Sequence, residues 1–527
     1  MLCFIIILKQ IEKNYKIYMI INKEQIDSND SNGNPIKLLI ISYVNKEGKI
    51  SYLKWQIPAT EMFEWVYTNR ANADKPFPAY DVNTRQPIID EITGQPKIVQ
   101  WKSYDNKWVR RNPTVKNLSE GRLNEIINSW GKVADPLFEA NTPITWFCDI
   151  EVDVSPEGFP EPDSASMPIN TIAITKFPKT IVFGRKPLSE KEINDIQENL
   201  RNYSDLTKDY EFEYRYYETE YQMIEAFIEF IKDIPAITGW NFLGYDWKYI
   251  KNRCENIGIT DLIKICPTQA YTRFKLNRKN VIDVQVPLHK IIYDYMLVYR
   301  QWDRSVEIKE SDTLDWVSNK VLGIKKVEHE WGFEEFYRDH YMEYVFYNAV
   351  DTILVEKIDE KLKTAQIWYM LSSELRVSLN DAYSTILPTE VVMTNFIYPQ
   401  YKVVPKKISN NEDVDTDYEG AFVWPTQPGV YKYIGGLDFA SLYPSTMIQF
   451  QISPESFLFK DPTYVPKANE IKTVSGAVYQ KRPDAILPAI LSHYFAKRKA
   501  AKGDRKAVDT DMEFLIRKYE ERFGKFE

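Results

Sequence analysis

The chain has 527 residues, of which 44% are hydrophobic and 27% are charged. This length allows about three or four domains of ordinary size, and the composition excludes a disordered, fibrous or multi-span membrane protein. The net charge of −8 means that any contact with nucleic acid must come from local basic patches.

The N-terminus opens on a short apolar run, residues 1–8, which is far below the ~20 residues that a membrane span needs. No basic region precedes this run, so neither a signal peptide nor a membrane partner is expected. Because Met19 begins an ordinary segment, residues 1–18 are a start-site extension, a flexible arm or a buried first strand.

The four cysteines form no Cys-x-x-Cys pair; they are Cys3, Cys148, Cys254 and Cys266. The chain has only four histidines to supplement them as ligands, so a zinc or iron–sulfur site is not expected. So few cysteines favour a reducing compartment without a disulfide framework.

Residues 20–143 alternate short apolar runs with Asn, Gly and Pro clusters, a pattern typical of strands, loops and a few helices, and they contain no catalytic motif. The following part predicts strands and one helix, at residues 144–154, 171–175, 180–183, 223–231 (the helix) and 235–241. This order indicates a mixed sheet and an α/β nuclease-like core. We find no internal repeat.

Two long helical patterns follow at residues 341–362 and 365–387. The polar linker 409–417 is the best candidate for a domain boundary. Beyond it, residues 429–434 predict a strand and residues 485–506 a basic helix.

The first candidate site begins with Asp149 and Glu151, which are two residues apart on a strand. Side chains alternate along a strand, so both point to one face, where they can bind a divalent cation. With 75 acids in the chain this spacing also arises by chance. However, two carboxylates at the end of an apolar strand need a cation or hydrogen-bond donors to neutralise them.

Two further acids belong to helices. Asp246 follows a strand and a glycine turn and begins a helix, so it is either a site residue or a helix N-cap. Tyr347 and Asp351 have i,i+4 spacing, which puts a phenol and a carboxylate on the same helix face. The alternative for this pair is a surface acid beside a half-buried tyrosine.

Taken together and in this order, the three segments resemble the three exonuclease motifs in the proofreading domain of family B DNA polymerases. The resemblance implies that four carboxylates bind two Mg²⁺ ions, for which Mn²⁺ can substitute; they are Asp149, Glu151, Asp246 and Asp351. It also implies that Tyr347 orients the attacking water at the terminal phosphodiester of a single-stranded DNA 3′ end.

The same resemblance assigns Asn241 to holding the terminal nucleotide. Tyr245 stands where the family commonly has phenylalanine, and no consequence is expected. The chemistry agrees with this set of residues, because phosphodiester hydrolysis needs cations on the attacking and departing oxygens. About four hard oxygen ligands fix such a pair of metals.

Residues 435–445 read Gly-Gly-Leu-Asp-Phe-Ala-Ser-Leu-Tyr-Pro-Ser and resemble motif A of the family B polymerase palm, with most likeness to the T-even-type bacteriophage members. The resemblance implies that Asp438 and the Phe439 carbonyl bind the catalytic metals. Ser441 and Leu442 would offer main-chain amides to the triphosphate, and Tyr443 would exclude a ribose 2′-hydroxyl. The alternative is a Pro-containing strand-to-helix turn with an incidental acid.

Two basic segments accompany these sites. Arg498 and Lys502 share a helix face and match the first triphosphate-binding helix of the fingers by the same resemblance; otherwise they form a solvated face. Residues 273–280 are a solvated loop or a hairpin near a substrate channel. Asp509-Thr-Asp511 imitates the second palm acid pair of the family, but its charged helical pattern excludes that role.

The resemblance implies an α/β multidomain chain without the remaining palm, fingers and thumb. The expected parts are an N-terminal mixed domain at residues 19–143, to which residues 364–409 return, a ribonuclease H-like 3′-to-5′ exonuclease domain at 144–363, the first half of the palm at 410–484 and the start of the fingers at 485–527.

The expected function is therefore the N-terminal subunit of a split family B DNA-directed DNA polymerase, in the cytoplasm of an infected host cell. It would bind primer-template DNA and deoxynucleoside triphosphates, need a complementing C-terminal subunit for synthesis, and reach a sliding clamp through that subunit. The polymerase site would then hold two Mg²⁺ ions. The alternatives are a free-standing 3′-to-5′ DNA exonuclease with a vestigial palm fragment and a non-catalytic DNA-tethering module.

Overall fold

The structure, a computed structural model, describes most of residues 20–523. The gaps within this range are residues 32, 82–83, 105–106, 114–115, 131–141, 156–157, 267–268, 278–280, 303–310, 376, 378, 380–381, 383–385, 406–424, 426, 437–438, 440 and 483–484. The expected arm at residues 1–18, the expected linker at 409–417 and the candidate metal ligand Asp438 therefore lie outside the described residues.

The chain folds into two compact units. The first is formed by the described residues of Met1–Pro58 and Lys132–Thr389, and the second by those of Ala59–Gly131 and Glu390–Glu527. Each unit thus joins two segments that are far apart in the sequence.

The centre of the first unit is a mixed six-stranded sheet in the order β12-β11-β10-β9-β13-β16. Its strands are β9 (Thr145–Val152), β10 (Ile169–Lys176), β11 (Lys179–Gly184), β12 (Glu211–Tyr216), β13 (Ala236–Gly239) and β16 (Ile291–Asp294). β10 pairs antiparallel with both β9 and β11, whereas β13 runs parallel to β9 and β16, and β12 parallel to β11. The mixed sheet expected from the sequence is thus present.

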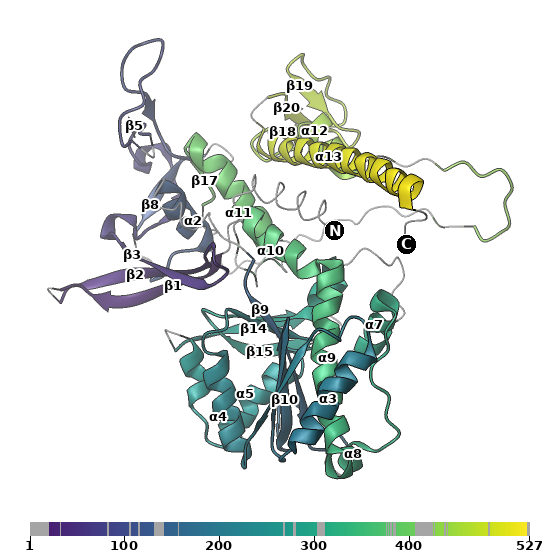
Figure 1. Cartoon of the computed structure of the whole chain (residues 1–527). Coiled ribbons are helices and arrows are strands. Elements are labelled where there is room, and N and C mark those ends of the chain that lie inside the picture. The colour runs from purple at the N-terminus through teal and green to yellow at the C-terminus, as the bar shows by residue number, and fades with distance from the viewer. Residues whose placement is uncertain are drawn as a thin grey trace. The chain divides into compact units, whose positions relative to one another are not determined.

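Helices cover both faces of this sheet (Figure 1). α4 (Glu220–Ile231) and α5 (Asp246–Asn256) lie on one face, and α3 (Glu190–Tyr203) and α9 (Tyr341–Leu362) lie on the other. α9 packs on β9, β10 and β11 and is buried around most of its circumference, as expected for a helix inside a core. The helix predicted at residues 341–362 is confirmed at these bounds.

β13 approaches β9 so closely that only glycine fits at its end. A Cβ atom on Gly239 would lie 2.1 Å from the Cys148 carbonyl oxygen. The last register pair between the two strands joins Thr238 with Phe147. The end of β9, which carries the two acids, therefore lies next to the turn that follows β13.

The remaining elements of the first unit surround this sheet. They are the strands β1 (Ile20–Asn29), β2 (Pro35–Val44), β3 (Ile50–Ile57), β14 (Tyr271–Asn277) and β15 (Val281–Pro287), and the helices η4 (Asp261–Ile265), α6 (Tyr295–Trp302), α7 (Leu314–Leu322), α8 (Phe333–Asp339) and α10 (Thr364–Leu375). β14 and β15 form an antiparallel hairpin. Residues 273–277 thus belong to a strand and not to a solvated loop.

The second unit begins with short strands around a small aromatic core. Its elements here are η1 (Ala59–Glu61), β4 (Glu64–Tyr67), η2 (Arg70–Asn72), β5 (Phe77–Pro78), β6 (Ile98–Val99), β7 (Lys102–Ser103), β8 (Val109–Asn112), α2 (Glu120–Ser129), η6 (Tyr398–Gln400) and β17 (Lys402–Val403). β17 pairs with β7, so the chain after α11 (Ile386–Ile397) returns to the N-terminal strands. Trp65 and Val403 lie in the same buried cluster.

A short repeat, which the sequence analysis missed, builds the arm between β5 and β6. Asp81 and Asp90 each open a turn with the pattern Asp-x-x-Thr-x-Gln-Pro. The extended segments beside the turns are joined by a closed cycle of three backbone hydrogen bonds. Ile88 N donates to Ala79 O (2.8 Å), Lys97 N to Ile88 O (2.8 Å) and Ala79 N to Lys97 O (2.7 Å). The two copies are only nine residues apart, so in the sequence they look like two ordinary turns.

The C-terminal part of the second unit contains α12 (Leu442–Gln449), the sheet β18 (Phe457–Lys460), β20 (Ala477–Gln480) and β19 (Glu470–Lys472), and α13 (Ile486–Phe523). α12 packs against α13. The predicted basic helix is confirmed and continues well beyond residue 506. It includes Thr510, so the segment Asp509–Asp511 is helical and not a hairpin.

Two expectations about secondary structure are wrong. The helix predicted at residues 365–387 is interrupted, because α10 ends where Val377 N bonds back to Ser372 O and the Ser372 hydroxyl donates to Val377 O. Residues 429–434 form no strand among the described residues, and Val430 and Tyr433 are fully exposed. An extended segment needs a neighbouring strand for its backbone groups, which periodicity cannot supply.

Candidate active site

β9 and α9 bring three carboxylates to one point. One oxygen from each of Asp149, Glu151 and Asp351 lies within 4.8 Å of the other two. Asp149 and Glu151 pair in register with Ala173 and Thr171 of β10, so the cross-strand neighbours of both acids have small side chains. Glu151 and Asp351 are only 8% and 3% exposed. The alternative of a surface acid at position 351 is therefore wrong.

Asp246 reaches the same strand from α5. Its Oδ1 accepts a hydrogen bond from the backbone N–H of Ile150, at 3.1 Å, and the side chain is 4% exposed. The N-cap position of α5 belongs to Tyr245, and Asp246 is the first helical residue. The N-cap interpretation is therefore wrong. The Asp246 carboxylate instead bonds to β9 at Ile150, which lies between Asp149 and Glu151.

Asn348, which the sequence analysis did not single out, orients one of the acids. Its Nδ2 donates to Asp149 Oδ2 at 2.7 Å, and its Oδ1 accepts from the Thr171 hydroxyl at 2.9 Å. Because its amide is held from both ends, the Asp149 carboxylate is fixed in one orientation. The signal in the sequence was its position three residues before Asp351, on the same side of the helix.

Lys326 is the second residue that the sequence analysis missed. Its Nζ lies 2.5 Å from Asp351 Oδ2 and donates to the Tyr347 hydroxyl at 2.9 Å. It comes from the segment after α7, 25 residues before Asp351, the acid that it contacts. No local pattern distinguishes it from its neighbour Lys325, so only the tertiary fold reveals the contact.

Burial and mutual repulsion change the pKa values of the acids. Burial, with the Asp351 charge beside it, raises the pKa of Asp149 to about 7. The pKa values of Glu151 and Asp246 are also raised well above their usual range by burial and then by the charge of Asp149. Burial raises the pKa of Asp351 as well, against the opposing effect of Lys326. The cluster is therefore costly to ionise without a cation.

The residues present fit a divalent metal. Asp351 Oδ1 is buried without a hydrogen-bond partner among the described residues. Lys326 is the one ammonium group that these acids contact among the described residues, so the cluster of four carboxylates has excess negative charge when it is fully ionised. Carboxylate oxygens are the ligands that Mg²⁺ and Mn²⁺ prefer, and a cation would satisfy both the orphaned oxygen and the charge.

Asn241 lies in the turn after β13 in a left-handed conformation, with φ of 60°. Gly244 has no room for a side chain, because its Cβ would lie 2.3 Å from Asn241 Oδ1. Tyr245, at the position where phenylalanine is common, donates its hydroxyl to the Pro160 carbonyl at 3.1 Å. The turn is thus shaped around the Asn241 amide, while its role in binding stays a prediction.

The second unit brings together two of the residues expected to bind a nucleotide. Arg498 Nη1, on α13, donates to the hydroxyl of Ser441 at 3.1 Å, and Ser441 precedes α12 with φ of 53°. The other candidates are exposed: Phe439 by 74%, Leu442 by 49%, Tyr443 by 73%, and Lys502 on α13. Their roles stay predictions.

Comparison with known families agrees with this arrangement. Residues 119–301 match the exonuclease domain of DNA polymerase family B, and residues 379–519 match DNA polymerase family B itself. The chain belongs to DNA polymerase family B. The first match covers Asp149, Glu151 and Asp246, and the second covers residues 435–445. No helix among the described residues is both long and apolar enough to cross a membrane.

Several known DNA polymerases are similar to this chain. The DNA-directed DNA polymerase of Escherichia phage RB69 is 26% identical over 394 residues, which are 70% of this chain and 43% of the relative. The enzyme of Enterobacteria phage T4 is 26% identical over 53% of this chain and 32% of the relative. A DNA polymerase of Archaeoglobus fulgidus is 26% identical over 55% and 35%. The chain thus spans less than half the length of these relatives.

Proposed function

We propose that the first unit is a 3′-to-5′ exonuclease acting on single-stranded DNA ends. The observation that carries this proposal is the convergence of the half-buried Asp149 with the buried Glu151 and Asp351, one of whose oxygens has no partner among the described residues. The mixed sheet covered by helices on both faces supports a ribonuclease H-like description of the unit.

Asp149, Glu151, Asp246 and Asp351 would hold two Mg²⁺ ions. When bound, these ions neutralise the carboxylates and supply charge to the attacking and departing oxygens of a phosphodiester. Asn348 keeps Asp149 in position as a ligand. In the same way the Ile150 amide keeps Asp246 in position.

Tyr347 and Lys326 would act on the attacking water. Burial and the neighbouring Asp351 charge raise the pKa of Tyr347, so its phenol stays protonated at neutral pH. Its oxygen accepts from Lys326, which leaves the phenolic proton free to hold a water by a hydrogen bond. Asn241 would bind the terminal nucleotide.

The second unit would supply part of a polymerase site, completed by a C-terminal polymerase polypeptide. Asp438 and the Phe439 carbonyl would hold two Mg²⁺ ions there, with Ser441, Leu442 and Arg498 at the triphosphate. Lys502 would add charge to that subsite, and Tyr443 would select deoxynucleotides. The contact between Arg498 and Ser441 supports a shared phosphate site. Primer-template DNA and a sliding clamp, through the second polypeptide, would be its further partners.

A free-standing exonuclease is the second candidate. It is favoured by one observation: all four acids, Tyr347 and Lys326 belong to the first unit.

The test uses the purified chain with Mg²⁺, a labelled single strand and a primer-template. We expect degradation of the single strand from its 3′ end and no primer extension until a polypeptide with the remaining palm and thumb is added. Asp351→Asn should reduce degradation by about 10²–10³-fold. Glu360→Gln, an exposed site on the same helix, is the control. Extension by the chain alone would contradict the split, and equal rates for both variants would contradict the exonuclease.

A further inference from the structure

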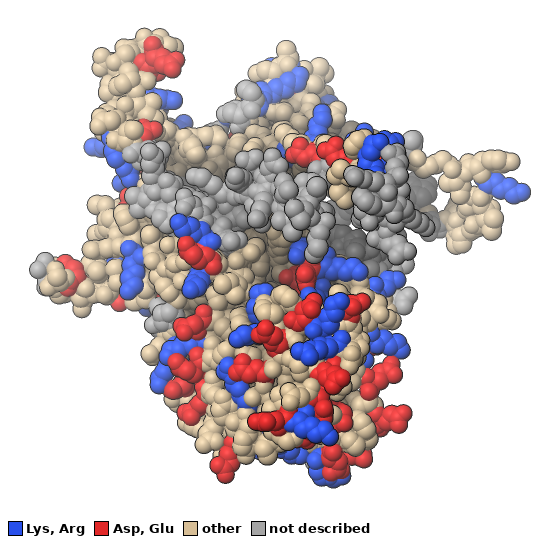
Figure 2. All heavy atoms as spheres, in the orientation of Figure 1, with Lys and Arg blue, Asp and Glu red and all other residues tan. Residues whose placement is uncertain are grey.

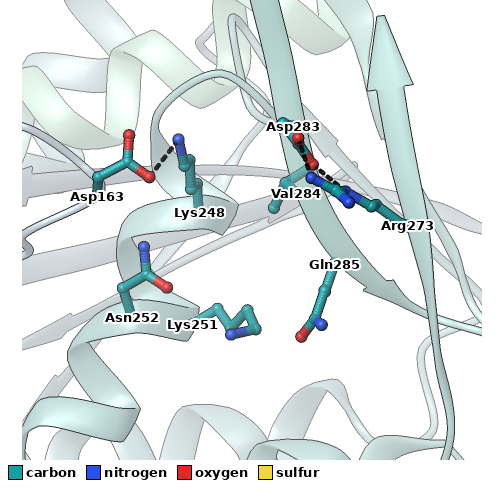
Figure 3. A pocket seen from close by; sticks show the side chains of 8 residues that line it. All are labelled: Asp163, Lys248, Lys251, Asn252, Arg273, Asp283, Val284 and Gln285. Carbon is teal, nitrogen blue, oxygen red and sulfur yellow. Dashed lines mark hydrogen bonds and ion pairs between the residues drawn. The ribbon is translucent and has the colours of Figure 1, made fainter.

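A hollow lies between α5 and the β14–β15 hairpin. It encloses about 260 Å³, and Figure 3 shows the side chains that line it. The lining residues are Asp163, Lys248, Lys251, Asn252, Arg273, Asp283, Val284 and Gln285. The bond from Trp247 Nε1 to Gln285 O, at 3.0 Å, joins α5 to the hairpin, so the hollow has fixed walls.

The hairpin has one apolar and one polar face. Phe274 and Val284 are buried, whereas Arg273 and Lys275 alternate with them on β14 and pair in register with Gln285 and Asp283 on the opposite strand. Because side chains alternate along a strand, these four polar residues share one face. Arg273, Asp283 and Gln285 of this polar face line the hollow, together with Val284.

The two lysines of the hollow are more buried than their acidic partners, whereas Arg273 is 67% exposed and donates to both carboxylate oxygens of Asp283, which is 30% exposed. Lys248 is 17% exposed and lies 2.6 Å from Asp163, which is 77% exposed. Lys251 is 12% exposed and lies 2.6 Å from Glu255, which is 65% exposed. Ion pairs with such exposed partners are weak, so an anion that enters the hollow can replace them.

This hollow is distinct from the acid cluster. On an α-helix each residue turns by about 100°, so Lys248, Lys251 and Asn252 lie about 200°, 140° and 240° around α5 from Asp246. They therefore face away from the strand that Asp246 contacts. Figure 2 shows acids and bases intermixed over the visible surface of the first unit, so a local group of cations matters for binding an anion.

We propose that this hollow is a phosphate-binding site, separate from the exonuclease centre. Lys248 and Lys251 supply compact positive charges and Arg273 a planar fork, the groups that best match phosphate oxygens. The Asn252 and Gln285 amides add hydrogen-bonding groups to the same walls. Three lining cations face two lining acids, which favours an anion over a metal ion, and Glu255, the partner of Lys251, lies outside the lining.

The identity of the phosphate rests on the proposed function. A protein that shortens DNA meets two sources of the same group: backbone phosphates of a DNA strand and the nucleoside monophosphates that it releases. Both offer oxygens of the same chemistry, and the volume of the hollow admits one phosphate with part of its sugar.

The test measures binding without hydrolysis, in EDTA. The parent chain is compared with Lys248→Gln/Lys251→Gln and with Lys208→Gln/Lys232→Gln, a control that removes two exposed, paired lysines from the same unit. The probes are a fluorescent single-stranded oligonucleotide, followed by anisotropy, and thymidine 5′-monophosphate, followed by calorimetry. Thermal unfolding checks that each variant is folded.

If the source is a DNA strand, the hollow variant loses about five- to tenfold in oligonucleotide affinity, and the slope of log affinity against log salt falls by about one to one and a half. If the source is the free nucleotide, the variant loses thymidine monophosphate binding that the parent has. Variants that match the control with both probes would overturn the proposal.

This result is independent of the exonuclease assay. A chain that binds through the hollow but does not degrade DNA with Mg²⁺ would leave the phosphate site standing and remove the proposed function. A chain that degrades DNA, while the hollow variant binds both probes like the control, would support the proposed function and overturn the phosphate site.

Discussion

At the scale of single residues, the acid cluster depends on neighbouring side chains that hold its like-charged carboxylates together. Asp351 offers one oxygen to Lys326 and leaves the other without a partner among the described residues. Asn348, one turn before Asp351 on α9, donates a hydrogen bond to Asp149 and so orients that carboxylate. The lysine thus offsets part of the repulsion between the carboxylates while one oxygen stays available for a metal.

Lys326→Gln tests this role. The variant leaves Asp351 buried without its cation, so we expect the metal-free protein to lose about 3 kcal/mol of stability and the exonuclease rate to fall by about 10- to 100-fold. Chemical unfolding in EDTA and a single-strand degradation assay measure the two effects.

Lys325→Gln is the matched control, because Lys325 is 63% exposed and pairs with the exposed Glu328. It should change neither quantity. Equal behaviour of the two variants would show that the contact between Lys326 and Asp351 contributes nothing.

At the scale of elements, the site depends on β13 ending beside β9. Gly239 allows this approach, and Asp246 then reaches the Ile150 amide from the first turn of α5. α9 lies across β9, β10 and β11 and carries Tyr347, Asn348 and Asp351 on the side that faces them. The acids therefore stay together only while three elements keep their spacing.

Gly239→Ala should disturb that spacing. The added Cβ would lie 2.1 Å from a backbone oxygen that cannot move aside alone, so we expect a loss of about 3 kcal/mol and weaker Mg²⁺ binding. Thermal unfolding with and without Mg²⁺ measures both.

Gly503→Ala is the comparison for that substitution. Gly503 lies within α13, in open space, where alanine should stabilise the helix by about 1 kcal/mol. A neutral effect at Gly239 would show that β13 can shift away from β9 without cost.

The raised pKa values predict a pH dependence for the metal-free protein. Asp149 has a pKa of about 7 in the folded state and a lower value when unfolded, so the folded state binds its proton more tightly. Stability in EDTA should therefore fall as the pH rises from about 4 to 7 and then level off.

Mg²⁺ should reverse this trend, because it binds the ionised carboxylates and its stabilisation grows over the same pH range. Chemical unfolding at a series of pH values, with EDTA or with Mg²⁺, measures it. Parallel curves in the two conditions would contradict metal binding at the cluster.

At the scale of the whole molecule, the two units differ in how well their apolar residues are covered. The sheet of the first unit is buried beneath helices on both faces, whereas all four residues of β18 in the second unit are exposed. Val430 and Tyr433 are also exposed. Apolar surface of this extent promotes association with other polypeptides.

We expect the isolated chain to self-associate at micromolar concentration. Phe457 and Leu458 are 48% and 42% exposed on β18. Replacing both by threonine, which keeps strand propensity, should raise the monomer fraction in gel filtration and leave the exonuclease rate unchanged. A parent chain that elutes as a clean monomer would contradict this expectation.

The sequence by itself determined the local elements and the acids that lie on them. Periodicity and turn residues are local properties, so β9 and α9 were predicted near their observed bounds and α5 at its first residue. The motif spacing pointed to the four acids Asp149, Glu151, Asp246 and Asp351. The interruption between α10 and α11 was not predicted, because periodicity does not reveal that Ser372 and Val377 bond to each other in a turn. The missing strand at residues 429–434 was not predicted, because a strand depends on a neighbouring strand elsewhere in the chain.

Only the tertiary structure decided what neutralises and orients the acids. Lys326 contacts Asp351 although α8 lies between them in the chain, and Asp246 bonds to a strand about a hundred residues earlier. The hollow between α5 and β14–β15 likewise joins side chains from separate segments. Charge interactions act through space over a few ångströms, and separation along the chain does not reveal which groups folding will bring within that range.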